Sequence, residues 1–224
     1  MGPNVLWLTE SLADCMDLRP GMRVLDLGCG RAYSSMFLAR EFGVQVWAAD
    51  LWIPPTENFR RVLAEGLEGS VFPLHAEAHT LPFAEGFFDA IVSMDAYHYF
   101  GTDNLYLSYV LKFLRAGGQI GINVPGLIQE FPDGLPDYLV EHWEPDFWSF
   151  HSPDWWRTHW ARSEEVDVAT ADTVPDSGQL WLKWLEECAA AGYPAEEEAL
   201  MLLADAGRNI GFTRVVARRR PVAG

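Results

Sequence analysis

Cysteine is scarce in this sequence, and long apolar runs are absent. The 224 residues include only three cysteines, Cys15, Cys29 and Cys188, which are too few and too widely spaced for a disulfide framework or a zinc cluster. No apolar run reaches the length of a membrane-spanning helix. The opening residues, MGPNVLWLTE, lack the charged flank and apolar block of a signal peptide. We therefore expect a cytoplasmic protein that does not associate with a membrane.

Basic residues are scarce as well. The chain has 16 Lys and Arg residues against 32 Asp and Glu, which gives a formal net charge of -16 at pH 7. A nucleic-acid-binding protein needs clustered lysine and arginine to contact phosphates, so nucleic acid is not an expected partner. The imbalance is largest from 126 to 206, which holds 18 acidic and 3 basic residues. Five of the ten tryptophans lie within 143–160, a pattern typical either of an aromatic core under a solvated acidic surface or of an aromatic binding element.

Strand-like and helix-like segments alternate along the chain. The expected strands span 23–28, 44–50, 71–76, 87–94, 119–125, 165–174 and 210–219. The expected helices span 5–16, 33–43, about 57–65, 104–118, 152–163, about 178–191 and about 194–206. This alternation predicts parallel strands joined by right-handed helical crossovers. We expect a single α/β domain over 1–224, with 126–160 inserted as an aromatic cap.

The stretch VLDLGCGRA, residues 24–32, breaks from an apolar run into glycines. Such a break predicts a ligand site, because ligands of open parallel sheets bind beyond the carboxyl ends of the strands. A dinucleotide site would have a third glycine where Tyr33 stands, and a nucleotide phosphate loop would have a lysine followed by serine or threonine. Asp26 precedes the glycines and would repel a phosphate but attract an ammonium or a sulfonium. Asp50 ends the next strand, where a carboxylate can accept hydrogen bonds from ribose hydroxyls.

The segment from about Gly21 to Pro125 resembles class I S-adenosylmethionine-dependent methyltransferases, particularly the ubiquinone/menaquinone-methyltransferase-like group (methyltransferase type 11). LDLGCGRA is similar to that family's glycine loop, with Ala32 where a third glycine is commoner. AEAHTLPFAEGFFDAIVS and LRAGGQIGI resemble later segments of the same domain. The resemblance implies a three-layer α/β sandwich around a Rossmann-like, seven-stranded, mostly parallel sheet whose last strand is antiparallel. It also implies S-adenosylmethionine as cofactor and S-adenosylhomocysteine as product.

The same resemblance implies the cofactor contacts. Glu77 stands where a carboxylate usually meets the adenine amino group, and Cys29 would contribute through its backbone. The candidate cofactor residues are Asp26, Gly28, Cys29, Gly30, Asp50, Leu51, Glu77, Ala78 and Ser93. The N-terminal segment, 1–20, is expected to form a helix over the cofactor.

The acceptor side is expected in SMDAYHYF, residues 93–100, and in the cap. His98 matches a histidine common in the resembling group and is a candidate general base, with an ordinary pKa near 6.5; the alternative is a histidine hydrogen-bonded to backbone. Asp95 departs from the group and could hold a cationic amine or assist His98. The candidate substrate contacts are Tyr97, Tyr99, His142, Trp143, Trp148 and His151, with packing or shielding of the cofactor as the alternative. No metal site is expected, because the cap histidines, His142 and His151, do not show a helical ligand spacing.

These observations together predict a methyltransferase that uses S-adenosylmethionine and acts on a small-molecule acceptor by in-line transfer. Two alternatives stay open. One is a protein that binds S-adenosylmethionine without catalysis, and the other is an NAD-dependent dehydrogenase, which Tyr33 opposes. The sequence leaves the acceptor and its reactive atom open, and it allows either a monomer or a homodimer.

Overall fold

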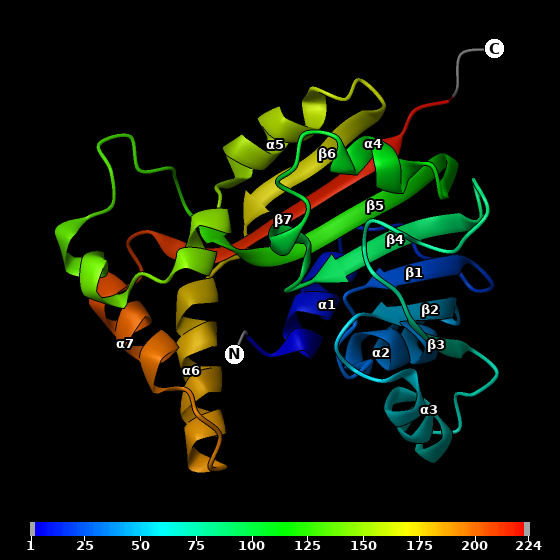
Figure 1. Cartoon of the computed structure of the whole chain (residues 1–224), viewed down its shortest axis with the longest axis horizontal. Helices are drawn as coiled ribbons and strands as arrows, with labels where there is room; N and C mark the ends of the chain where they lie inside the picture. Colours follow the sequence, from blue (N-terminus) through cyan, green and yellow to red (C-terminus); the bar gives the residue numbers. More distant parts are fainter. Residues whose placement is uncertain (1–2, 222–224) are drawn as a thin grey trace.

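The computed structural model describes residues 3–221 and contains one seven-stranded sheet. The strand order is β3-β2-β1-β4-β5-β7-β6 (Figure 1). The strands are β1 (Arg23–Leu27), β2 (Gln45–Asp50), β3 (Val71–His75), β4 (Phe88–Met94), β5 (Leu114–Leu127), β6 (Val166–Thr173) and β7 (Ile210–Arg219). Strand β7 runs antiparallel to both β5 and β6, whereas the other neighbours are parallel. The expected seven-stranded, mostly parallel sheet with an antiparallel last strand is confirmed.

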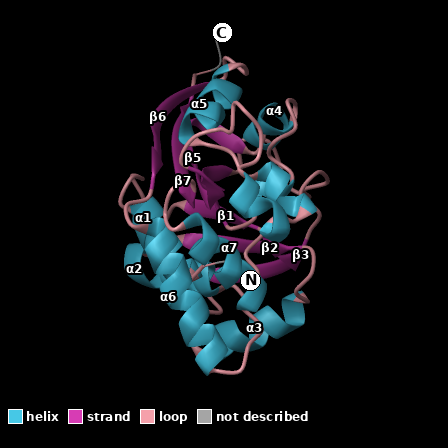
Figure 2. Cartoon of the chain, turned by 90° about the vertical axis from the view of Figure 1, so that its left-hand side faces the viewer, coloured by secondary structure: helices cyan, strands magenta, loops and turns pink. Residues whose placement is uncertain are grey.

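Helices cover both faces of this sheet (Figure 2). The first face carries α1 (Val5–Ala13), α2 (Tyr33–Phe42), α3 (Pro55–Ala64), α6 (Ser177–Ala190) and α7 (Glu196–Asp205). The second face carries α4 (Tyr106–Leu111) and α5 (Pro153–Ala161). Each layer of helices buries its own apolar cluster against the strands, such as Leu12 and Leu38 on the first face and Leu107 and Trp160 on the second. The fold is therefore a three-layer sandwich.

The helix expected over 104–118 is shorter in the structure, and this is a correction. Helix α4 ends at Leu111, and strand β5 already begins at Leu114, whose backbone pairs with Phe88. Gly117 has a left-handed φ of 74°, and a Cβ on Gly118 would lie 2.7 Å from the carbonyl oxygen of Asp89. The paired glycines therefore bring β5 close to β4, and they do not end a helix.

The segment expected as one cap, 126–160, is narrower in the structure. Gly126 and Leu127 still belong to β5, where they pair with β7. At the other end, Ser152 caps α5 by accepting a hydrogen bond from the backbone of Trp155. Trp156 and Trp160 of that helix are fully buried in the core of the second face. Only 128–150 lies outside the strands and α-helices, and it holds two short 3₁₀ turns, η2 (Asp137–His142) and η3 (Pro145–Ser149). This segment packs on the first face of the sandwich, where Leu139 and Phe150 are buried in the core.

Candidate functional site

A cavity of about 520 Å³ opens at the carboxyl ends of β1, β2 and β4. This is the edge of the sheet at which an open α/β fold binds ligands. Its lining residues are Val5, Leu27, Gly28, Cys29, Gly30, Arg31, Tyr33, Ala49, Asp50, Leu51, Trp52, Ala76, Glu77, Ala78, His79, Asp95, Ala96, Tyr99 and Phe100. Seven of the nine predicted cofactor residues are among them. Val5, in the first turn of α1, lies among these lining residues, and a position of this helix over a bound cofactor stays a prediction.

The loop between β1 and α2 forms the floor of this cavity. Gly28 and Gly30 have φ values of 75° and 53°, in the left-handed region that glycine adopts without steric cost. A Cβ on Gly28 would lie 2.4 Å from the Cβ of Ala96, so a larger residue would push the loop away from the end of β4. The backbone amides of Gly28 and Cys29 donate to the carbonyl of Ala49, at 2.9 and 3.1 Å. Gly28 is thus required by the close approach of Ala96, whereas Gly30 avoids the backbone strain that a side chain would bring at its φ.

Asp50 connects this loop to the turn after β2. Its Oδ2 accepts a hydrogen bond from the amide of Gly30 at 2.8 Å, and its Oδ1 accepts from the amides of Trp52 and Ile53, each at 2.8 Å. A carboxylate offers about four acceptor positions, so one remains for a ligand hydroxyl. Asp50 therefore both organises the loop and faces the cavity.

Asn58 is a residue of this site that sequence reasoning missed. It lies within α3, is almost fully buried, and donates from Nδ2 to the carbonyl of Gly30 at 2.8 Å. This hydrogen bond therefore connects the glycine loop to α3. An asparagine in the middle of a helix carries no local signal of such a role, because the partner lies 28 residues away.

Asp26 and Ser93, both predicted as cofactor contacts, do not line the cavity. Asp26 is fully buried, and its Oδ2 accepts hydrogen bonds from the hydroxyls of Ser34 and Ser35 at 2.6 and 2.5 Å. Burial raises the pKa of Asp26 to about 6. Ser93 is also buried and donates to the carbonyl of Leu27 at 2.7 Å. The structure places both side chains behind the glycine loop, where Asp26 holds the start of α2.

Glu77 and Ala78 line the cavity at the end of β3. Glu77 Oε1 lies 2.7 Å from Nδ1 of His79, and Oε2 accepts from the His79 amide at 2.9 Å. The hydrogen bonds from His79 hold the pKa of Glu77 below its usual range. The carboxylate of Glu77 is therefore ionised and remains partly exposed at the cavity wall.

Asp95 follows β4 on the opposite side of the glycine loop from Asp50. Its φ of 52° lies in the left-handed region, and its amide donates to the carbonyl of Asn123 at 2.9 Å. Among residues 3–221, no side chain donates a hydrogen bond to the Asp95 carboxylate. Burial raises the pKa of this carboxyl to about 7. The cavity thus contains a carboxyl group that can both hold and release a proton near neutral pH.

The turn η1 (Tyr97–Tyr99) distributes its three residues over three environments. Tyr99 lines the cavity, and its ring centroid lies 6.2 Å from that of Trp52. His98 is buried outside the cavity lining, against Tyr99 and Phe150, and burial lowers its pKa to about 3. Tyr97 is fully buried in the core of the second face. The structure therefore brings Tyr99 to the cavity, but not His98 or Tyr97.

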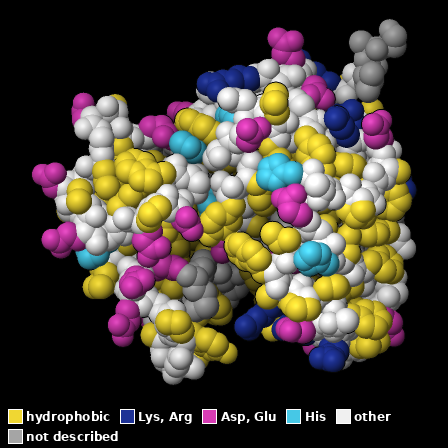
Figure 3. All heavy atoms as spheres, viewed as in Figure 1, with side chains coloured by type: hydrophobic (Ala, Val, Ile, Leu, Met, Phe, Trp, Pro, Cys, Tyr) yellow, Lys and Arg dark blue, Asp and Glu magenta, His cyan; other side chains and the backbone are white. Residues whose placement is uncertain are grey.

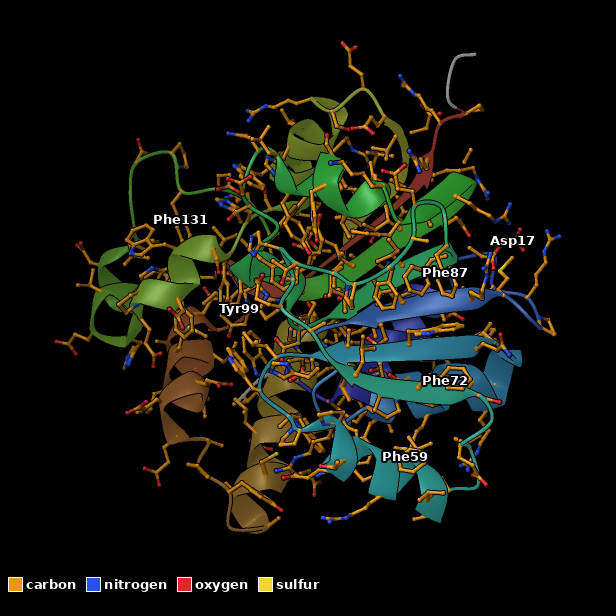
Figure 4. The ribbon with its side chains drawn as sticks, turned by 45° about the vertical axis from the view of Figure 1, so that its right-hand side comes forward. Asp17, Phe59, Phe72, Phe87, Tyr99 and Phe131 are labelled. Atoms are coloured by element: carbon orange, nitrogen blue, oxygen red, sulfur yellow. The ribbon has the colours of Figure 1, made fainter. Side chains whose placement is uncertain are left out.

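The other predicted substrate residues lie in or beside the cap, and none of them lines the cavity. Trp143 packs against three phenylalanines, at ring-centroid distances of 5.6 to 6.3 Å, and Trp148 is 63% exposed. His151 stacks on Trp155 with centroids 3.7 Å apart, and His142 ends η2. Figure 4 places Tyr99 between the strand ends and the segment that carries Phe131. The cap reaches the cavity wall indirectly, through the contact of Phe150 with His98.

Two further observations concern the described residues, 3–221, alone. No group of three or more His, Cys, Asp or Glu side chains is arranged to hold a metal ion there. No helix in that range is both long and apolar enough to cross a membrane.

Comparisons with known proteins connect this site to a family. A family model described as a methyltransferase domain matches residues 24–118, the part that contains the glycine loop and Asp95. Methyltransferase GfsG of Streptomyces halstedii is 34% identical over 116 residues, which cover 51% of this chain and 42% of that relative. The matched part thus spans less than half the length of GfsG.

Solved structures share the fold at low sequence identity. Phosphoethanolamine N-methyltransferase 2 of Haemonchus contortus, in complex with S-adenosyl-L-methionine, has a TM-score of 0.80 at 18% identity, covering 98% of this chain and 54% of that one. Geranyl diphosphate C-methyltransferase of Streptomyces coelicolor A3(2), bound to S-adenosyl-L-homocysteine, has a TM-score of 0.76 at 18% identity, covering 96% and 77%. The narrower ubiquinone/menaquinone-like assignment stays a prediction. Residues 24–118 are thus similar to a methyltransferase domain, and the fold of the described residues is similar to that of solved methyltransferases bound to S-adenosyl-L-methionine or S-adenosyl-L-homocysteine.

Proposed function

We propose that this chain binds S-adenosylmethionine in the 520 Å³ cavity and methylates a small-molecule acceptor at the Asp95 end. The proposal depends on one observation, which is that three groups line the same cavity. These are the glycine loop after β1, the carboxylate of Asp50 after β2, and the carboxyl of Asp95 after β4. A donor held along the first two would present its reactive end toward the third.

The residues present fit this cofactor. A Cβ added to Gly30 would meet nothing within 4 Å, so the loop leaves open space beside its backbone. Asp50 retains an acceptor position for a ribose hydroxyl, and Glu77 can accept from an adenine amino group. Exposed Leu51 offers an apolar surface to the base. Arg31 is the only lysine or arginine among the lining residues, which disfavours the pyrophosphate of NAD.

S-adenosylmethionine would supply a methyl group that its sulfonium already activates, so the protein contributes mainly position and proton transfer. Well-oriented reactants reach effective molarities on the order of 10⁵ to 10⁸ M. A general base adds roughly 10²- to 10⁴-fold where the acceptor must lose a proton. We assign that base to Asp95, because it lines the cavity and its pKa of about 7 lies near working pH. His98, buried behind Tyr99, becomes a positioning residue in this proposal.

Ligand-dependent thermal melts test the cofactor assignment. S-adenosylmethionine or S-adenosylhomocysteine should stabilise the chain by about 2.7 kcal/mol at a hundredfold excess over Kd, and NAD should do little. A larger shift with NAD would overturn the assignment. Transfer of a labelled methyl group to a metabolite pool then tests catalysis, and binding without transfer would favour the non-catalytic alternative.

A further inference from the structure

Building on the proposed function, we infer that Asn123 of β5 and Arg214 of β7 are positioning residues. They hold helix α1 on the sheet, so that its first turn stays at the wall of the cofactor cavity. The inference adds to the proposed site two residues that do not themselves line the cavity. It depends on their hydrogen bonds to α1, on the incomplete apolar packing around this helix, and on a buried amide oxygen.

Asn123 and Arg214 both donate hydrogen bonds to backbone carbonyls of α1. Nδ2 of Asn123 donates to the carbonyl of Leu8 at 3.1 Å, and Nη1 of Arg214 donates to the carbonyl of Ser11 at 2.8 Å. The two residues lie opposite each other in the antiparallel ladder of β5 and β7. A carbonyl oxygen has two lone pairs, so Leu8 can accept from the sheet as well as from its own helix. Asn123 and Arg214 together form what we call the α1 clasp.

The guanidinium of Arg214 suits the end of a helix. Ser11 belongs to the last turn of α1, where carbonyls lack amide partners within the helix, and the helix dipole favours a cation there. Nη1 also donates to the Ser11 hydroxyl at 3.1 Å. The other two nitrogens donate to Asp172 of β6, at 3.0 and 2.8 Å. Asp172 thus fixes the guanidinium plane, and the remaining nitrogen is left to hold α1.

Apolar packing encloses α1 only in part. Leu12 is buried in the core of the first face. Beneath the helix, however, β5 presents Gly121, whose added Cβ would lie 2.7 Å from Sδ of Met16. Toward α6, the helix borders a cavity of about 360 Å³ that Trp7 and Arg214 line. Figure 3 shows the surface notched at its lower edge, between the part where Figure 1 places α6 and the part that holds the parallel strands. The clasp therefore contributes to fixing the position of α1.

Asn123 also connects α1 to the other wall of the cofactor cavity. Its backbone carbonyl accepts a hydrogen bond from the amide of Asp95 at 2.9 Å, while its side chain donates to Leu8. Asp95 lines the cavity, and so does Val5, three residues before Leu8. A looser hold on α1 would therefore change the space in which the cofactor is proposed to bind.

The amide oxygen of Asn123 distinguishes a positioning role from a purely stabilising one. The side chain is fully buried, and its Oδ1 has no hydrogen-bond partner among residues 3–221. Such an atom lowers stability, because it loses its contact with water without a replacement. An apolar side chain of the same shape should therefore fold at least as stably. The contribution of the amide then lies in the hydrogen bond that it makes to α1.

Hydrogen exchange of the full chain without ligand tests the clasp. Asn123→Leu keeps the shape of the side chain but removes the donor, and Arg214→Met removes the guanidinium. In each variant the amides of α1 should exchange roughly fivefold faster or more, whereas those of α2 should keep their rates. Arg220→Met is the matched control, because Arg220 also pairs with β6 but donates to Asp167 and Glu164 instead of α1. Unchanged exchange in α1, or equal acceleration in α2, would overturn the inference.

Calorimetry with S-adenosylhomocysteine then tests the positioning. The Kd should rise roughly fivefold or more in Asn123→Leu and Arg214→Met, while the Tm of Asn123→Leu stays at or above that of the original chain. Arg214→Lys keeps one donor and should recover part of the affinity. Faster exchange of α1 with unchanged affinity, or a fall in Tm that accompanies the loss of affinity in Asn123→Leu, would contradict the inference. If the original chain did not bind S-adenosylhomocysteine, the proposed function and the positioning role would both fail, whereas the exchange rates judge the hold on α1 separately.

Discussion

At the residue scale, burial shifts the pKa values of three titratable groups near the cavity, Asp26, Asp95 and His98. Burial raises the pKa of Asp26 to about 6 and that of Asp95 to about 7, and it lowers the pKa of His98 to about 3. The consequences for stability have opposite signs. The carboxyls stabilise the fold below pH 4, and this contribution is lost as pH rises through their folded-state values. The His98 contribution is present above pH 6.5 and is lost as pH falls toward 3.

Asp26→Asn should therefore change stability in a pH-dependent way. The amide carries no charge and can still accept hydrogen bonds from Ser34 and Ser35 through its oxygen. Relative to the original chain, the variant should gain free energy of unfolding on the order of 3 kcal/mol between pH 4 and pH 8, since each pKa unit is worth about 1.4 kcal/mol. Urea unfolding at the two pH values measures this. Asp133→Asn, an exposed loop change, is the control, and an equal effect of the two variants would contradict the explanation.

Asp50→Ala should weaken cofactor binding and also lower stability. The change leaves the amides of Gly30, Trp52 and Ile53 without their acceptor, in addition to removing the one acceptor position proposed for a ribose hydroxyl. A hydrogen bond to a charged group contributes about 1.5 to 3 kcal/mol, so affinity for S-adenosylhomocysteine should fall at least tenfold. Calorimetry and thermal melts measure the two effects. Glu57→Ala, on the exposed side of α3, should change neither, and unchanged affinity in Asp50→Ala would remove Asp50 from the site.

At the element scale, the tryptophan-rich stretch divides into two parts with different surroundings. Trp156 and Trp160 lie on α5 and fill the core of the second face. Trp143 and Trp148 lie in the segment 128–150, where Trp148 is 63% exposed and Trp143 packs among phenylalanines. A role in closing over the acceptor remains a proposal for this second part alone.

Alanine substitutions should separate the two parts. Trp156→Ala should lower the free energy of unfolding by about 3 to 5 kcal/mol because it leaves a large cavity in the core, while the affinity for S-adenosylhomocysteine stays within a few fold. Trp148→Ala should stay within about 0.5 kcal/mol of the original stability and should alter only acceptor binding or turnover. Chemical unfolding and cofactor titrations on both variants distinguish these outcomes. Equal destabilisation by the two changes would contradict the division, and unchanged acceptor use in Trp148→Ala would argue against a lid.

At the scale of the whole molecule, charge is distributed unevenly along the chain, with acidic residues concentrated in 126–206 and arginines in and just after β7. Two arginines form ion pairs with β6. Arg214 of β7 pairs with Asp172, and Arg220, just after β7, pairs with Asp167, each at 2.8 Å. The segment 126–206 holds 18 acidic and 3 basic residues, and the net charge of the chain is -16. Self-repulsion of this kind destabilises a compact state.

Salt should therefore stabilise the chain at pH 8. Raising NaCl from 10 to 300 mM shortens the Debye length from about 30 Å to less than 8 Å, which screens repulsion between acidic residues. We expect Tm to rise by roughly 2 to 4 °C, equivalent to about 1 kcal/mol in a chain of this size. The rise should be smaller at pH 5, close to the sequence pI of 4.6. Melts at the four conditions provide the measurement, and a fall in Tm with salt at pH 8 would show that favourable ion pairs dominate.

Prediction from sequence succeeded where the signal is local. Strand β7 is expected over 210–219 and has those bounds. The helix that is expected to stop at Gly43 ends at Phe42, with Gly43 as its left-handed cap. The glycine loop and Asp50 were located because a strand end, a tight turn and a spacing of twenty residues are all visible along the chain. The boundary between α4 and β5 was wrong, because the pairing of Leu114 with Phe88 involves a segment 26 residues away.

Local sequence signals are enough to place the strands, most of the helices and the edge of the sheet at which the cavity opens, since hydrophobic periodicity and turn residues act between neighbours in the chain. Only the tertiary structure decided which side chains face the cavity. Successive residues of a 3₁₀ turn point in different directions, and the left-handed φ of Asp95 sets the start of that turn. Tyr99 consequently enters the cavity while His98 is buried. Asp26 likewise turns inward to two serines, because side-chain direction is set by partners that packing brings together.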